Sequence, residues 1–255
     1  MQETFTTQGG HRTAQTVRHT LRLIALVVRE WLRLIVPLTC VGCDAPDTVL
    51  CDGCLMRMAP RIAAIPDTDF PIYHATLYEG SNRNVIARWK DHGREDASEP
   101  IRALAEIAGQ NLVQRLRFTE RSPRVIVVPM PSSRTATRER GFVPAEVIAD
   151  GLTQGLRRGV NAPDAVQVMP GGLKVRAGKD DQSGLGRQTR RKNIRGKIRA
   201  TDQLRAAVRT TDVIILADDV VTTGATIAEA ARVLHPAQGT LVAGFALVAT
   251  PKAKP

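Results

Sequence analysis

The sequence predicts an α/β domain with a mainly parallel sheet flanked by helices, preceded by a helix and a small cysteine-rich module. Two apolar runs, 213–217 and 241–248, have the continuous hydrophobic character of parallel strands buried on both faces. A helical pattern over 227–234 separates them, which indicates a strand–loop–helix–strand unit. All four cysteines fall within fifteen positions. We therefore expect three parts, which are residues 1–36, 37–60 and 72–255.

Length and composition limit the possible partners. A chain of 255 residues with 43% apolar residues can bury one sizeable core and a small appended module. The formal net charge of +11 favours anionic partners such as phosphorylated ligands, nucleic acid or acidic lipid. Aromatic residues are only 4%, which argues against an extended platform for stacking nucleic-acid bases.

The N-terminal segment 21–36 is apolar, but charged residues interrupt it. Its longest uninterrupted apolar run, 23–28, has six residues, whereas a spanning helix needs about 20. No small-residue cleavage site follows the run, so we expect no signal peptide, no stable membrane span and a cytoplasmic location. The apolar spacing predicts an amphipathic helix over 14–35, ended by Pro37. This helix could pack on its own domain or bind a membrane surface.

The cysteines form two CxxC pairs separated by seven residues, and they are Cys40, Cys43, Cys51 and Cys54. Each CxxC turn can direct two thiolates at one centre, and two turns supply the tetrahedral S4 set of a structural Zn2+ site. Two disulfides or a redox dithiol are the alternatives, but stable disulfides are rare in a reducing compartment. Four thiolates leave no open coordination position, so the expected zinc is structural.

An acidic pair, Asp218 and Asp219, follows the apolar run 213–217. A short loop then leads into the helix, and its residues are Val221, Thr222, Thr223, Gly224, Ala225 and Thr226. Such a loop before a helix N-terminus can bind a phosphate. The carboxylates would repel that phosphate unless they faced sugar hydroxyls or a divalent cation, so ribose 5-phosphate suits both features. An ordinary strand and capped helix would not explain two acids and three threonines.

A second predicted strand, 125–128, is stopped by Pro129 and Pro131 and precedes a helix over about 145–156. Between them we expect a loop that offers hydroxyl donors and positive charge to a second anionic group. Its candidate residues are Ser132, Ser133, Arg134, Arg138 and Arg140.

The segment 174–199 holds ten basic residues and two aspartates, and therefore much of the excess positive charge. Its glycines favour a mobile loop that closes over a ligand, although a solvated basic linker is an equally good interpretation. Arg187 and Arg191 are its candidate binding residues.

The stretch 214–226 resembles the PRPP motif of type I phosphoribosyltransferases, in which an acidic pair precedes TTGxT. The resemblance implies that Asp218 and Asp219 hold the ribose 2′ and 3′ hydroxyls and that 222–226 cradle the 5′-phosphate. It also implies that the loop around Arg134 binds pyrophosphate and that Mg2+ accompanies PRPP.

From the cysteine pairs onward, the chain resembles the ComF family of competence proteins. The shared features are two CxxC pairs, a VPxP strand end with RxRGF, a series from Arg176 to Gly196, and DDVVTTGAT. The resemblance also gives Lys90 as a substrate-binding lysine. Val143 and Pro144 depart from it, because the family continues RGF with Asn and Gln.

Two functions follow from this resemblance. The first is transfer of a 5-phosphoribosyl group from PRPP to a nitrogenous acceptor, which is a step of nucleoside metabolism. The second is a part in natural DNA uptake, with contacts to single-stranded DNA or a DNA helicase and a regulatory or vestigial PRPP site.

Overall fold

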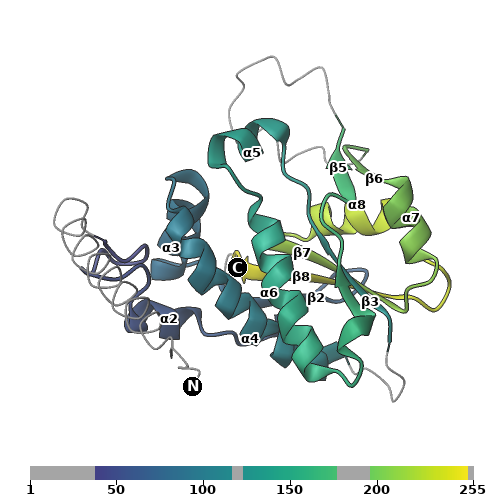
Figure 1. Ribbon diagram of the computed structural model, residues 1–255, viewed down its shortest axis with the longest axis horizontal. Coiled ribbons are helices and arrows are strands. Elements are labelled where there is room, and N and C mark those ends of the chain that lie inside the picture. The colour runs from purple at the N-terminus through teal and green to yellow at the C-terminus, as the bar shows by residue number, and fades with distance from the viewer. Residues whose placement is uncertain (1–37, 117–122, 177–195, 252–255) are drawn as a thin grey trace, which may run out of the picture.

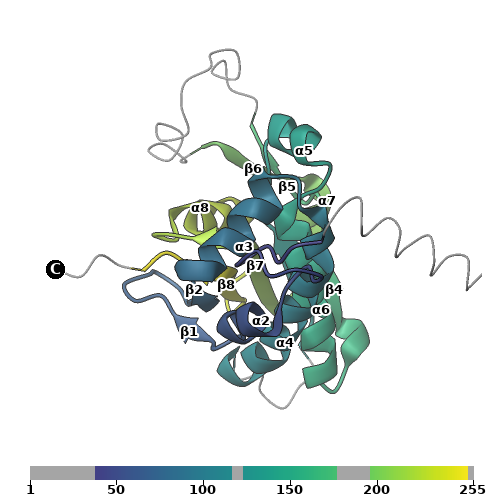
Figure 2. The same cartoon turned by 90° about the vertical axis from the view of Figure 1, so that its left-hand side faces the viewer.

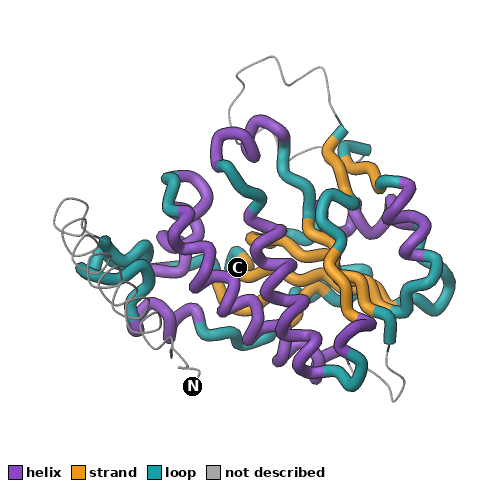
Figure 3. Tube along the Cα trace, viewed as in Figure 1, coloured by secondary structure: helices purple, strands orange, loops and turns teal. Residues whose placement is uncertain are grey.

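The computed structural model describes residues 38–116, 123–176 and 196–251. The expected helix over 14–35 lies outside this part of the chain. One six-stranded sheet forms the centre of the molecule, with helices around it (Figure 3). Four of its five strand pairings are parallel, and only the pairing of β1 with β2 is antiparallel. In spatial order the strands are β1 (Ala63–Ala64), β2 (Ile72–Leu77), β8 (Leu241–Ala249), β7 (Val213–Val221), β3 (Val125–Pro129) and β4 (Val166–Val168). The predicted mixed α/β fold with a mostly parallel sheet is confirmed.

Helices cover both faces of this sheet (Figures 1 and 2). The long helices α4 (Ser98–Leu116) and α6 (Pro144–Gly159) lie on one face, and α8 (Ala225–Leu234) lies on the other. The shorter helices are α2 (Asp52–Met58), α3 (Gly80–Asp91), α5 (Arg134–Arg140) and α7 (Asp202–Val208), with single 3-10 turns η1 (Glu95–Ala97) and η2 (Pro163–Ala165). A separate antiparallel ribbon joins β5 (Leu173–Val175) to β6 (Ile198–Ala200), so the two ends of the basic segment pair with each other.

The strands at the centre are buried on both faces, as their continuous apolar runs predict. On β7, Ile215 and Ala217 belong to the core under α4 and α6. Their neighbours Ile214 and Leu216 belong to the second core, which contains the apolar side chains of α7 and α8. Because side chains alternate along a strand, one apolar run supplies both cores.

The path of the chain creates a topological switch point between β3 and β7. These two strands are neighbours and pair in parallel, with Pro129 opposite Ala217. From β3 the chain passes through α6 to β4 on one side, whereas from β7 it passes through α8 to β8 on the other side. In open α/β sheets, ligands bind at the carboxyl ends of the strands at such a point.

Two local expectations differ from the structure. Strand β7 does not end before the acidic pair but continues to Val221, because pairing with β8 extends to Val221 opposite Ala249. The segment that carries Arg134, Arg138 and Arg140 was expected to be a loop, but it is the helix α5. Ser133 starts this helix by accepting a hydrogen bond from the N–H of Ala136 at 3.2 Å, which is a strong N-terminal capping signal.

Glycines allow α4 and α6 to approach each other closely. A Cβ on Gly155 of α6 would overlap the carbonyl oxygen of Glu106 on α4, and a Cβ on Gly151 would overlap that of Arg102. On α4, a Cβ on Gly109 would overlap the carbonyl oxygen of Leu152. Side chains at these positions would push apart the two helices that cover this face of the sheet.

We expect Gly155→Ala to destabilise the protein by about 2–3 kcal/mol, because overpacking of a well-packed contact outweighs the helix propensity of alanine. Chemical denaturation followed by circular dichroism measures this change. Gly53→Ala is the matched control, since the nearest atom to its new Cβ is the end of the Arg57 side chain at 3.8 Å. An unchanged midpoint for Gly155→Ala would contradict the close approach.

Candidate functional site

The acidic pair lies at the carboxyl end of β7, beside the end of β3. The side chain of Asp219 is buried and that of Asp218 is half-buried. Asp218 Oδ1 accepts a hydrogen bond from the N–H of Asp219 at 2.9 Å, and Asp219 Oδ1 accepts one from the N–H of Val220 at 2.8 Å. Both carboxylates are therefore held by the backbone of their own strand.

The loop after β7 leads directly into the N-terminus of α8. Gly224 has a φ of 79°, in the left-handed region that favours glycine, and a Cβ there would lie 2.6 Å from Cδ1 of Ile72. The N-cap residue Gly224 has no side chain to cap α8, and Oγ1 of Thr223 accepts a hydrogen bond from the N–H of Ala225 at 3.4 Å. Thr223 is exposed, and Thr222 and Thr226 are partly exposed. This end of the helix thus offers backbone N–H groups and hydroxyls to an anion.

Helix α5 places positive charge at the end of the neighbouring strand β3. Arg134 and Arg138 are exposed, and none of the residues of α5 is buried. Arg140 is only 22% exposed, and its Nη2 lies 3.3 Å from Oδ1 of Asp91 on α3. Because β3 and β7 are adjacent, the structure brings the two predicted polar segments to the same edge of the sheet.

The last turn of α3 contacts the end of β7 and the segment 140–142 through three consecutive residues. The ring of Trp89 is fully buried, with its centroid 5.4 Å from that of Phe142. Lys90 forms an ion pair with Asp219, and Asp91 forms the pair with Arg140. The family resemblance pointed to Lys90, but the sequence analysis did not single out its neighbours Trp89 and Asp91. The partners of Trp89 and Asp91 are Phe142 and Arg140, which are about 50 positions away, so no local sequence pattern predicts these contacts.

The Lys90–Asp219 pair determines the electrostatics of the site. Its side chains are 21% and 9% exposed, respectively. Burial raises the pKa of Asp219, but the ammonium of Lys90 overcomes this effect and holds the pKa below its usual value. For Asp218, burial and the neighbouring Asp219 carboxylate raise the pKa well above its usual value. Asp219 therefore ionises more readily than Asp218.

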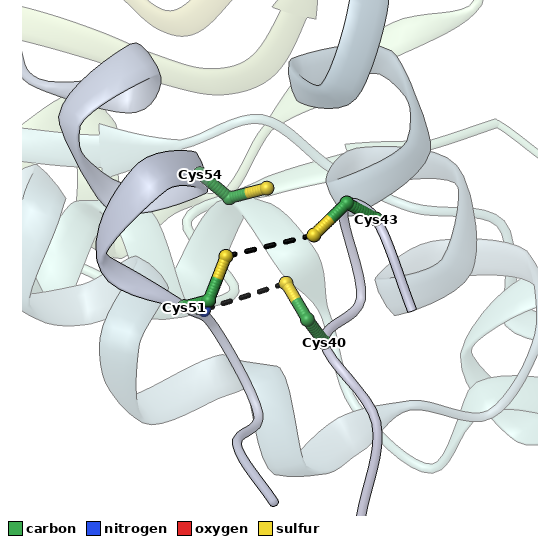
Figure 4. A group of neighbouring side chains, drawn as sticks. All are labelled: Cys40, Cys43, Cys51 and Cys54. Atoms are coloured by element: carbon green, nitrogen blue, oxygen red, sulfur yellow. Dashed lines mark hydrogen bonds between the residues drawn. The ribbon is translucent and has the colours of Figure 1, made fainter. Parts of the chain in front are cut away.

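The four cysteines form a compact cluster whose sulfur atoms point toward one another (Figure 4). All four are free thiols, and their Sγ atoms lie within 4.8 Å of one another. Zinc–sulfur bonds of about 2.3 Å in a tetrahedron require sulfur–sulfur distances of about 3.8 Å. Cys43 and Cys51 have their Sγ atoms 3.5 Å apart. The cluster is therefore close enough to hold one metal ion.

Backbone N–H groups favour a thiolate at Cys40. Its Sγ accepts hydrogen bonds from the N–H groups of Gly42 and Cys51, both at 3.4 Å. Burial opposes ionisation, but these hydrogen bonds lower the pKa of Cys40 to about 6. By contrast, burial raises the pKa of Cys54 to about 12.

Helix α3 also anchors the cysteine-rich module. Arg88 donates to the carbonyl oxygen of Cys40 at 3.4 Å and to Oδ2 of Asp44 at 2.9 Å. Asn84 donates to the carbonyl oxygen of Gly42 at 3.1 Å. Arg57, next to the second cysteine pair, donates to Oγ of Ser81 at 2.8 Å and to Sγ of Cys54 at 3.4 Å. The same helix therefore contacts both the cysteine module and the acidic pair.

Some predicted features fall outside the described residues. These include Arg187 and Arg191 of the basic segment and the amphipathic pattern over 14–35. Val143 and Pro144, which replace the Asn and Gln expected from the resemblance, start helix α6 as its N-cap and first residue. None of the helices in the described part of the chain has the length and apolar character that a membrane span requires.

Comparison with known proteins does not identify the chain. No protein family matches its sequence, and no curated protein matches it.

We expect Lys90→Met to destabilise the protein by about 3 kcal/mol at pH 8, because it leaves a buried carboxylate without its counter-charge. Without Lys90, burial and mutual repulsion raise the pKa of both acids. An acid whose pKa is raised by folding destabilises the folded state above its unfolded pKa of about 4, so the loss should be smaller at pH 5 than at pH 8.

Urea denaturation at both pH values measures this difference. Arg83→Met is the matched control, since it removes an exposed cation from the same helix. Its effect should stay within about 0.5 kcal/mol at either pH. An equal loss for Lys90→Met at both pH values would contradict the assigned electrostatics.

Proposed function

We propose that this chain is a ComF-type protein with a type I phosphoribosyltransferase fold, which binds PRPP and transfers its 5-phosphoribosyl group to a nitrogenous acceptor. The observation that carries the proposal is the juxtaposition at the switch point between β3 and β7. There an acidic pair and a threonine- and glycine-containing loop end β7, and a basic helix follows the end of the adjacent strand β3. Each feature suits a different part of PRPP.

The 5′-phosphate suits the loop between β7 and α8. The N–H groups of the first turn of α8 and the hydroxyls of Thr222, Thr223 and Thr226 are candidate donors for phosphate oxygens. The ribose hydroxyls suit Asp218 and Asp219, because carboxylates accept hydrogen bonds from hydroxyl groups. The pyrophosphate suits helix α5, which follows β3 and exposes Arg134 and Arg138.

In this proposal the catalytic contribution is positional and electrostatic. The acidic pair holds the ribose in one orientation, so that its C1 faces the acceptor. The arginines of α5 stabilise the negative charge that develops on the departing pyrophosphate. Arg140 is already oriented by its ion pair with Asp91.

The decisive experiment measures pyrophosphate release from PRPP by the purified protein in the presence of candidate nitrogenous bases. Release that depends on one base supports transfer and identifies the acceptor. PRPP binding without release by any base supports a regulatory site, and no binding at all would reject the proposal.

We expect Thr222→Val and Thr226→Val to weaken binding of ribose 5-phosphate by about 10–100-fold each. A hydrogen bond to a charged group is worth about 1.5–3 kcal/mol, and valine keeps the shape of threonine while removing the donor. Isothermal titration calorimetry measures these affinities. Thr210→Val, an exposed threonine before β7, is the control and should bind as the wild type does. Equal affinities in all variants would place the phosphate elsewhere.

We further propose that the cysteine cluster binds one structural Zn2+. The four thiols fit this ion in number, in spacing and in their closed coordination set. The metal would cross-link the two CxxC turns, the first of which accepts hydrogen bonds from α3.

We expect purified protein to contain one zinc per chain and Cys43→Ser to lose most of it. Structural zinc contributes about 10–16 kcal/mol of apparent binding free energy in small domains, so metal removal should also increase hydrogen exchange in α3. Elemental analysis and exchange mass spectrometry test the two statements. The control is Met56→Ser, which changes a 72% exposed residue of the same module. Metal-free wild-type protein, purified without chelator, would refute the zinc proposal.

A further inference from the structure

Both carboxylate oxygens of Asp219 already have a partner within the chain. Oδ1 accepts the N–H of Val220 at 2.8 Å, and Oδ2 contacts the ammonium of Lys90. This ion pair is largely removed from solvent, as the side chains of Lys90 and Asp219 are 21% and 9% exposed. A cation is therefore already present at the acidic pair, and the protein itself supplies it.

The residues around the pair do not suit a divalent cation such as Mg2+. This ion requires near-octahedral oxygen coordination and is usually held by one or two carboxylates together with ligand phosphates. Both oxygens of Asp219 already have partners in the chain. The ammonium of Lys90 would repel it from Asp219.

We propose that Lys90 is the resident cation of the acidic pair, so that this site binds ribose phosphates without a divalent cation. This inference rests on the proposed ribose-phosphate site and departs from the Mg2+ that the family resemblance implies. Lys90 acts as a positioning residue, because it holds the Asp219 carboxylate in place and compensates its charge.

The charge balance of the site supports this role. A carboxylate pair next to a phosphate-binding loop would repel the phosphate of the ligand. Burial and the nearby Asp219 carboxylate raise the pKa of Asp218, so the pair tends toward a single negative charge that one ammonium can balance. The phosphate then approaches a nearly neutral surface, while the carboxyl oxygens remain able to bond sugar hydroxyls.

The position of Lys90 is fixed by its two neighbours in the sequence. The indole N–H of Trp89 donates to Oγ of Ser98 at 2.8 Å, and its ring packs against Phe142. Asp91 pairs with Arg140 on α5. The last turn of α3 is thus held on both sides of Lys90, which fixes the backbone position from which the ammonium reaches the acidic pair.

Mn2+ alone is the first probe, because it prefers the same oxygen ligands as Mg2+ and its binding is measured directly by electron paramagnetic resonance. The samples are zinc-loaded wild type, Lys90→Gln, Lys90→Gln with Asp219→Asn, and Arg83→Gln as the exposed-cation control. We expect Lys90→Gln to bind one Mn2+ at least tenfold more tightly than the wild type and the double variant to lose this site. Arg83→Gln should match the wild type.

The second probe is ribose 5-phosphate, titrated into wild-type protein in Mg2+-free buffer and in buffer with Mg2+. Metal-depleted buffer is used in place of a chelator, so that zinc stays on the cysteines. We expect the two affinities to agree within threefold. The ribose 5-phosphate titration uses only the wild type. Thermal melting verifies that the variants in the Mn2+ experiment are folded.

Three results would overturn the inference. These are a wild-type Mn2+ site that is absent from the double variant, a Lys90→Gln variant that gains no Mn2+ affinity, or a tenfold loss of ribose 5-phosphate affinity without Mg2+. If the wild type binds no ribose 5-phosphate in either buffer, the proposed function fails. The Mn2+ comparison then still decides whether Lys90 excludes a divalent cation.

Discussion

The burial of β7 on both faces is the constraint on which the arrangement of the site depends. Ile214 and Leu216 pack into one core while Ile215 and Ala217 pack into the other, so this strand accepts polar side chains only near its end. The acidic pair occurs at that end, where backbone N–H groups and one ammonium satisfy its oxygens. The switch point then adds the end of β3 and the basic helix beside it.

Helix α3 links this site to the cysteine module. Its middle residues donate hydrogen bonds to the backbone of the first CxxC turn, and its last turn pairs with Asp219 and with Arg140. A helix is a rigid element with a rise of about 1.5 Å per residue, so a displacement at one end is carried to the other. The metal proposed for the cysteines would thus stabilise the platform that presents Lys90.

Much of the local structure could be predicted from the sequence, because it depends on short-range patterns. Continuous apolar runs identified β3, β7 and β8, and the spacing of Cys40, Cys43, Cys51 and Cys54 predicted their convergence. The helix α5 was missed because three arginines and two prolines suggested a loop. Its capping serine, Ser133, was the signal that could have identified it.

By itself the sequence determined the class of fold, the cysteine cluster and the polar residues that follow two of the strands. These features depend on periodicity, on turn chemistry and on neighbours within a few residues. Only the tertiary structure decided that β3 and β7 are adjacent and that Lys90 pairs with Asp219. The ion pair joins residues 129 positions apart, and its formation depends on how α3 packs beside the sheet. No local pattern of residues encodes that packing.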